Sequence, residues 1–66
     1  MNEYAFYRAR CDEMLKAAAE TPLANVRERC ERAAEAFEKL ADQAGRAEAT
    51  RAKEKLRRAE SGLVST

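Results

Sequence analysis

The sequence of 66 residues contains no histidine and no tryptophan, and its two glycines stand at positions 45 and 62. Histidine is the commonest general base and metal ligand, so its absence excludes nucleophile pairs of the Ser-His or Cys-His type. Two isolated glycines cannot form a glycine-rich phosphate loop. The carboxylates stand among Arg and Lys, and nothing in the pattern predicts the desolvation that a catalytic carboxylate requires. We therefore expect a protein that is not an enzyme and needs no metal or cofactor.

Long apolar runs are also missing. No run approaches the roughly 20 residues of a membrane-spanning helix, and the first residues lack the basic and apolar regions of a secretory signal. These absences favour the cytoplasm, no membrane association and reduced thiols at the two cysteines. The formal net charge of +1 gives the chain as a whole no long-range attraction to nucleic acid or anionic lipid.

Alanine is abundant: it accounts for 15 of the 30 hydrophobic residues. Together with many Glu, Arg, Lys and Leu residues it is typical of long helices and coiled coils, whereas strand-favouring residues are few. The sequence therefore predicts an all-α protein. A domain this small gains about as much from burial as it loses in conformational entropy, and association with a second copy is the simplest remedy.

Two stripes of apolar residues with heptad spacing cover the first 44 residues. They consist of Tyr4, Tyr7, Cys11, Met14 and Ala18, and of Leu23, Val26, Cys30, Ala33, Phe37, Leu40 and Ala44. Spacing of three and four residues places each stripe on one side of an α-helix. Pro22 disfavours helical geometry at Thr21, whose hydroxyl can then cap a following helix. We predict a helix at 3–19, a turn at 20–21 and a helix at 22–44.

A connection this short requires the two helices to lie antiparallel as a hairpin. The two stripes then meet in one register, with the layers Ala18–Leu23, Leu15–Val26, Cys11–Cys30, Tyr7–Ala34 and Tyr4–Phe37. The residues expected to carry the packing are Tyr4, Tyr7, Cys11, Leu15, Val26, Cys30, Phe37 and Leu40.

Gly45 marks a change of phase in the apolar stripe. The stripe beyond it, which includes Leu56, is turned by about 140° relative to the second stripe. Gly45 could end the helix and start another at 46–60, or it could lie inside one long or kinked helix, which we favour because no good N-cap residue follows. In either case we expect one domain at 1–60 and a flexible tail at 61–66.

A long second helix would extend some 20 residues beyond the first and expose its stripe unless another chain covers it. Phe6 also favours association with another chain, because it lies off the first stripe, on a face with small residues. Such a face suits a dimer contact, although a single exposed Phe is also common. We therefore expect packing into a dimeric helical bundle, and an unidentified protein partner is an alternative.

Two further functions are open to a chain of this composition. The stretch 46–60 carries a net charge of +3, against −2 for residues 1–45. Its basic residues, which could contact nucleic-acid phosphates, are Arg46, Arg51, Lys53, Lys55, Arg57 and Arg58. Glu48, Glu54 and Glu60 interrupt this patch, and a solvated helix face is the alternative. Cys11 and Cys30 could form a regulated disulfide, or they could be buried apolar side chains.

The segment from Tyr7 to Ala41 resembles a group of short uncharacterised bacterial proteins that form helical hairpins. The matching residues are Tyr7-Arg8-Ala9, Glu13, Ala17-Ala18, Pro22, Val26-Arg27, Cys30, Ala33-Ala34, Phe37 and Leu40-Ala41. Cys30 stands where that group has His, and Phe37 where it has Tyr. The resemblance implies a hairpin and no known activity, substrate or cofactor. The function expected from the sequence is that of a structural or interaction module that self-associates.

Overall fold

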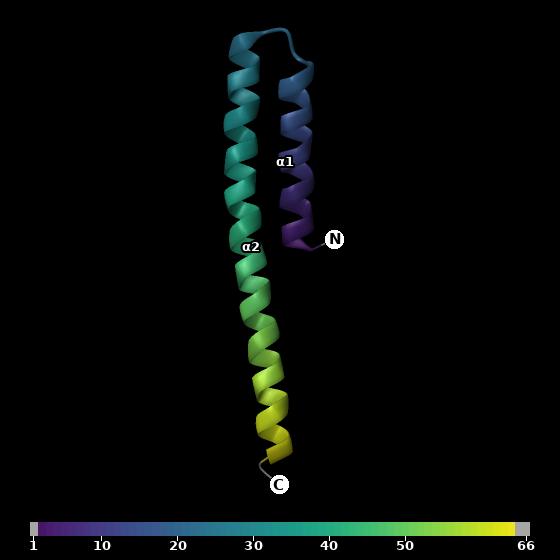
Figure 1. Cartoon of the computed structure of the whole chain (residues 1–66), viewed down its shortest axis with the longest axis vertical. Helices are drawn as coiled ribbons and strands as arrows, with labels where there is room; N and C mark the ends of the chain where they lie inside the picture. The colour runs from purple at the N-terminus through teal and green to yellow at the C-terminus, as the bar shows by residue number, and fades with distance from the viewer. Residues whose placement is uncertain (1, 65–66) are drawn as a thin grey trace.

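The protein is an antiparallel hairpin of two α-helices of unequal length. The computed structural model describes residues 2–64, with α1 at Glu3–Glu20 and α2 at Ala24–Val64, and side chains are described for residues 2–62. The hairpin measures 66 × 16 × 10 Å. Figure 1 shows α1 beside the first half of α2, and the second half of α2 continuing without a partner helix. The prediction of an all-α hairpin with a long second helix is confirmed.

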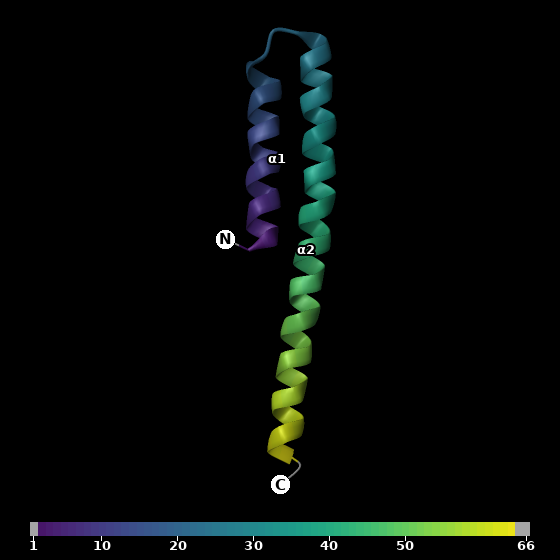
Figure 2. The same cartoon turned by 180° about the vertical axis from the view of Figure 1, so that it is seen from behind.

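The N-terminus of α1 marks the point where the paired part of the molecule ends. Asn2 is the N-cap of α1, and its side-chain oxygen accepts a hydrogen bond of 2.8 Å from the amide of Ala5. Its side-chain nitrogen donates to Glu48 Oε1 of α2 at 3.1 Å. Beyond Glu48, α2 continues past the N-terminus of α1 without a helix beside it, as the view from the opposite side also shows (Figure 2). We call residues 49–64 of α2 the projecting segment.

The connection between the helices consists of residues 21–23. Thr21 has the extended backbone that a following proline imposes, with φ −83° and ψ 136°. The expected hydrogen bond to its hydroxyl is present, donated by the amide of Leu23 at 3.2 Å. However, α2 begins at Ala24, two residues later than Pro22. The reversal needs an extra stretch of non-helical chain because Thr21 still donates its amide to Ala17 of α1.

The longer connection changes the register of the hairpin. Tyr7 stacks on Phe37, with ring centroids 6.4 Å apart, instead of facing Ala34. Tyr4 does not face Phe37: its ring lies against Gly45, with Cδ2 3.3 Å from where a β-carbon at that position would be. The helices are displaced by about one turn from the predicted layers. That predicted register is wrong.

Gly45 lies inside an unbroken helix. None of the described residues has a positive φ, so Gly45 does not end a helix, and α2 runs through it to Val64. The missing side chain instead leaves room for the ring of Tyr4. Residues 61–64, expected in a flexible tail, are helical, and residues 65 and 66 of that tail lie outside the described residues.

The seam between the helices buries small side chains. The residues that are buried in the described part of the chain are Cys11, Ala18, Ala34, Ala41 and Ala44. Among the residues expected to carry the packing, Cys11 is buried. Four are half-buried: Tyr7, Val26, Cys30 and Phe37. Three are exposed: Tyr4, Leu15 and Leu40. Only residues that point straight at the partner helix lose their contact with solvent, so the larger side chains lie along the edges of the seam.

Arg27 of α2 fixes the connection to the end of α1. Its guanidinium donates from Nε to the carbonyl oxygen of Ala18 at 3.3 Å and from Nη2 to that of Thr21 at 3.1 Å. Carbonyls at a helix C-terminus lack partners within the helix and carry partial negative charge, so a cation that binds them stabilises the end of the helix.

We expect Arg27→Ala to lower the free energy of unfolding by about 1 kcal/mol, because two carbonyls lose a charged donor that is itself exposed to solvent. Urea denaturation followed by circular dichroism measures the change. Arg29→Ala is the matched control, since Arg29 is exposed and makes no such bond, and its effect should stay within about 0.5 kcal/mol. Equal effects of the two substitutions would show that the bonds of Arg27 contribute nothing.

Candidate interaction surfaces

One side of the hairpin carries a group of aromatic and apolar side chains from both helices. The ring of Phe6 meets that of Tyr7 edge to face at 5.5 Å between centroids, and Tyr7 in turn stacks on Phe37 of α2. The guanidinium of Arg10 lies over the Phe37 ring, 5.5 Å from its centroid. This arrangement is the aromatic face, which consists of Phe6, Tyr7, Arg10, Phe37 and the adjoining Leu40.

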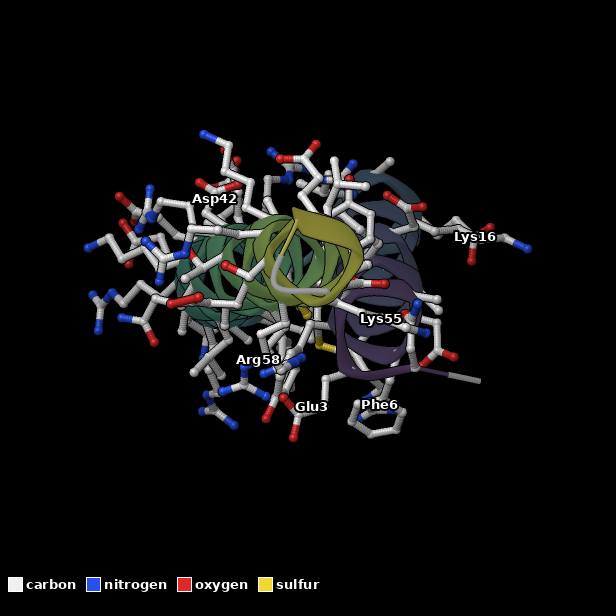
Figure 3. All side chains as sticks on the ribbon, turned by 90° about the horizontal axis from the view of Figure 1, so that it is seen from below. Glu3, Phe6, Lys16, Asp42, Lys55 and Arg58 are labelled. Atoms are coloured by element: carbon white, nitrogen blue, oxygen red, sulfur yellow. The ribbon has the colours of Figure 1, made fainter. Side chains whose placement is uncertain are left out.

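The aromatic face continues into a shallow open depression between the helices. Its lining residues are Glu3, Tyr7, Leu40, Gln43, Ala44 and Ala47. Seen along the helix axes, Phe6 and Glu3 project from the same side of the hairpin, whereas Asp42 projects from the other side (Figure 3). Phe6 remains 50% exposed and Leu40 38% exposed. A face of this kind offers apolar surface with a concave centre to another helix.

Leu15 is as exposed as Phe6, at 50%, but it does not belong to the aromatic face. Nine residues separate the two on α1, which is about 180° around a helix. The side of the hairpin to which Leu15 turns also carries the ion pair of Arg8 with Asp12, at 3.6 Å. Exposed apolar residues therefore lie on both sides of the hairpin, Leu15 and Tyr4 on one side and Phe6 and Leu40 on the other, and the contacts between rings distinguish the aromatic face.

The projecting segment and the last turn before it carry the six basic residues predicted as nucleic-acid contacts. Arg51, Lys55 and Arg58 follow one another at intervals of four and three residues, so they share one line along α2. Figure 3 shows the side chains of Lys55 and Arg58 extending away from the helix axis. A second line, of Arg46, Lys53 and Arg57, lies across the helix from the first.

Two of the three carboxylates in this region are held by other groups. Glu54 accepts two hydrogen bonds, of 2.5 and 2.6 Å, from Nη2 of Arg57, and Glu48 accepts from Asn2. None of Arg51, Lys55 and Arg58 forms an ion pair with any side chain among residues 2–62. The first basic line thus keeps its full charge toward solvent.

Leu56, predicted as an interface residue, is 62% exposed on the projecting segment. Its neighbours in the stripe are the small residues Ala49, Ala52 and Ala59. A shallow depression elsewhere on this segment is lined by Thr50, Lys53, Glu54 and Arg57. Over residues 49–62, whose side chains are described, the segment therefore has little apolar surface apart from Leu56.

The two cysteines are both free thiols, Cys11 buried and Cys30 half-buried. The predicted register placed them in one layer, but the observed displacement of about one turn separates such positions by about 6 Å along the helix axes. This axial offset alone nearly reaches the Cα separation that a disulfide spans, and the gap between the two helices lies at right angles to it and lengthens the distance further. A disulfide within one chain would require a change of register.

Metal-binding groups do not gather in the part of the chain that the structure describes: no three His, Cys, Asp or Glu side chains are placed to hold an ion. Neither α1 nor α2, over its described residues, combines the length and apolar character needed to cross a membrane.

No protein-family model matches this chain, and no curated protein or solved structure matches it. The resemblance to short bacterial hairpin proteins thus remains a prediction from the residues that carry it. The function has to be inferred from the two surfaces described above, the aromatic face and the basic projecting segment.

The sequence indicated some of these residues and missed others. Phe6, Tyr7, Phe37 and Leu40 were all predicted as packing or interface residues, and the structure brings them together with Arg10, which was not. Nothing local marks Arg10, because its contact with Phe37 depends on the register. The N-cap Asn2 had a local signal, an Asn directly before a helix-forming stretch.

Proposed function

We propose that this protein is a non-catalytic helical module that self-associates through its aromatic face into a dimeric four-helix bundle. The observation that carries the proposal is the composition of the seam: four alanines and one cysteine are the buried residues among those described, while the aromatic and larger aliphatic side chains stay half-buried or exposed. A second hairpin packed on the aromatic face would cover Phe6, Tyr7, Phe37 and Leu40.

The surface area of the single chain supports this proposal. The accessible surface is 5472 Å², whereas a compact monomer of 7.4 kDa has about 4,200 Å². The excess of about 1,300 Å² is more than the roughly 800 Å² that each partner buries in a standard protein interface. Part of this surplus belongs to the projecting segment, so the area permits a dimer contact of ordinary size, and the ring contacts favour the aromatic face as its place.

A second copy of the chain is the proposed partner because it carries the same aromatic face. A two-fold axis brings the same patch of both copies together, so the rings of one aromatic face can pack against the depression of the other. A different protein with an apolar helix remains the alternative partner. The proposed location is the cytoplasm, where thiols such as the free Cys11 and Cys30 stay reduced.

Thermal unfolding at two protein concentrations tests the proposal. Because folding and association are coupled in a dimer of this kind, raising the concentration about 100-fold adds about 2.7 kcal/mol to its apparent stability. For two chains of this length the melting temperature should rise by about 10 °C. A melting temperature that stays within about 1 °C would show that the hairpin folds alone.

A further inference from the structure

The projecting segment is suited to a different kind of binding partner from the aromatic face. It extends beyond α1 as a single helix of about 24 Å, with solvent around it rather than a second helix. Residues 46–60 carry a net charge of +3, against −2 for residues 1–45. Two copies of such a segment repel each other, so a second projecting segment is a poor partner for it. The charge favours a polyanion.

The distribution of the charge around the helix narrows the choice of polyanion. At about 100° per residue, the line of Arg51, Lys55 and Arg58 lies on one flank of the stripe that contains Leu56, about 100° away. The line of Arg46, Lys53 and Arg57 lies at a similar angle on the other flank. The helix thus presents a narrow apolar front between two rows of cations, with Glu60, about 40° from Leu56, at the edge of the front nearer the second row.

The major groove of B-form DNA has the complementary arrangement. It is about 12 Å wide, which admits a single α-helix, and a phosphate backbone runs along each of its edges. A front of alanines lets the helix approach the floor of the groove closely, and alanine and leucine side chains can contact thymine methyl groups there. The cationic rows on the two flanks would face the two backbones.

The carboxylates leave the first row free and engage one member of the second. Glu48 is held by Asn2 and Glu54 by Arg57, so the row of Arg51, Lys55 and Arg58 has no carboxylate partner among the described side chains. We propose that the projecting segment binds double-stranded DNA in the major groove, through phosphate contacts from Arg51, Lys55 and Arg58 on one flank and from Lys53 on the other. This proposal does not depend on the aromatic face, because each chain carries a complete projecting segment.

An anionic membrane is the other polyanion that attracts a basic amphipathic helix. Such helices bury a face of large apolar residues such as Trp, Phe and Leu among the lipid chains. By sequence, the stripe of the projecting segment offers two leucines, Leu56 and Leu63, and no aromatic residue, together with the alanines at positions 49, 52 and 59. Alanine contributes little to insertion, and DNA is therefore the partner that the residues favour.

The test uses the full chain and a fluorescent 20-base-pair DNA duplex, with binding followed by fluorescence anisotropy. With about four phosphates neutralised, the affinity should fall by about 100-fold between about 50 and 200 mM salt. A duplex RNA of the same sequence should bind at least about tenfold more weakly, because its major groove is too narrow for a helix. No binding at about 50 mM salt, or equal binding to RNA, would overturn the proposal.

Two matched variants locate the site. Replacing Arg51, Lys55 and Arg58 with Gln should weaken binding at least about tenfold and reduce the salt slope by about 2–3. The control replaces Arg29, Arg32 and Lys39 of the paired region with Gln. It removes the same charge and should change the affinity less than about threefold. Circular dichroism checks the helix content of both. Equal losses in the two variants, or tighter binding to phosphatidylserine vesicles than to DNA, would contradict the proposal.

Discussion

Replacing Phe37 with alanine should lower the free energy of unfolding by about 3 kcal/mol, enough to leave a domain of this size largely unfolded at room temperature. The ring of Phe37 stacks on Tyr7 and supports the guanidinium of Arg10, so its loss removes the main contact between large side chains of the two helices. Loss of helical signal in circular dichroism, with urea denaturation of any folded remainder, measures the effect.

Two controls separate the role of Phe37 from that of apolar surface in general. Phe37→Leu keeps most of the volume and should cost less than about 1.5 kcal/mol. Leu23→Ala removes a side chain that is 57% exposed in the connection, and it should cost about 0.5 kcal/mol. If Phe37→Ala melted like the unmodified protein, Phe37 would not support the hairpin.

Replacing Phe6 with glutamate should dissociate the proposed dimer. Phe6 is 50% exposed in the single hairpin, so the substitution removes little packing within a chain. It places a charge on the aromatic face, where packing of a second copy would have to remove that charge from water, and the dissociation constant should rise by about 100-fold or more. Within α1, a glutamate at position 6 lies four residues before Arg10, a spacing that favours the helix.

Leu15→Glu is the matched control for this substitution. Leu15 has the same exposed fraction as Phe6 and lies on the opposite side of α1. We expect Leu15→Glu to leave the mass in solution unchanged, as measured by light scattering, while Phe6→Glu halves it. Dissociation by both variants would place the contact elsewhere or indicate general destabilisation, and dissociation by neither would exclude the aromatic face.

Much of the fold could be predicted because its causes are local. Heptad spacing identifies both helices, and Pro22 marks the turn between them. The change of phase at Gly45 also has a structural cause that the sequence alone did not reveal. The N-terminus of α1 lies opposite Glu48, and beyond that point the apolar stripe of α2 has no α1 to face. The stripe changes direction where its partner helix stops.

The register could not be predicted, because it depends on two residues of the connection. Starting α2 at Ala24 instead of Pro22 displaces its residues along α1 and brings Phe37, rather than Ala34, next to Tyr7. The same displacement determines which residues are buried and forms the contact with Arg10. The predicted stripes were close to the seam, but a two-helix seam has room to bury only its smallest members.

The central claim, that this hairpin completes its packing with a second copy, is tested most directly by sedimentation equilibrium of the unmodified full chain at about 100 µM. The account predicts a weight-average mass of twice the 7.4 kDa of one chain, falling toward 7.4 kDa on dilution. A folded helical species with a mass of 7.4 kDa at every concentration would contradict it.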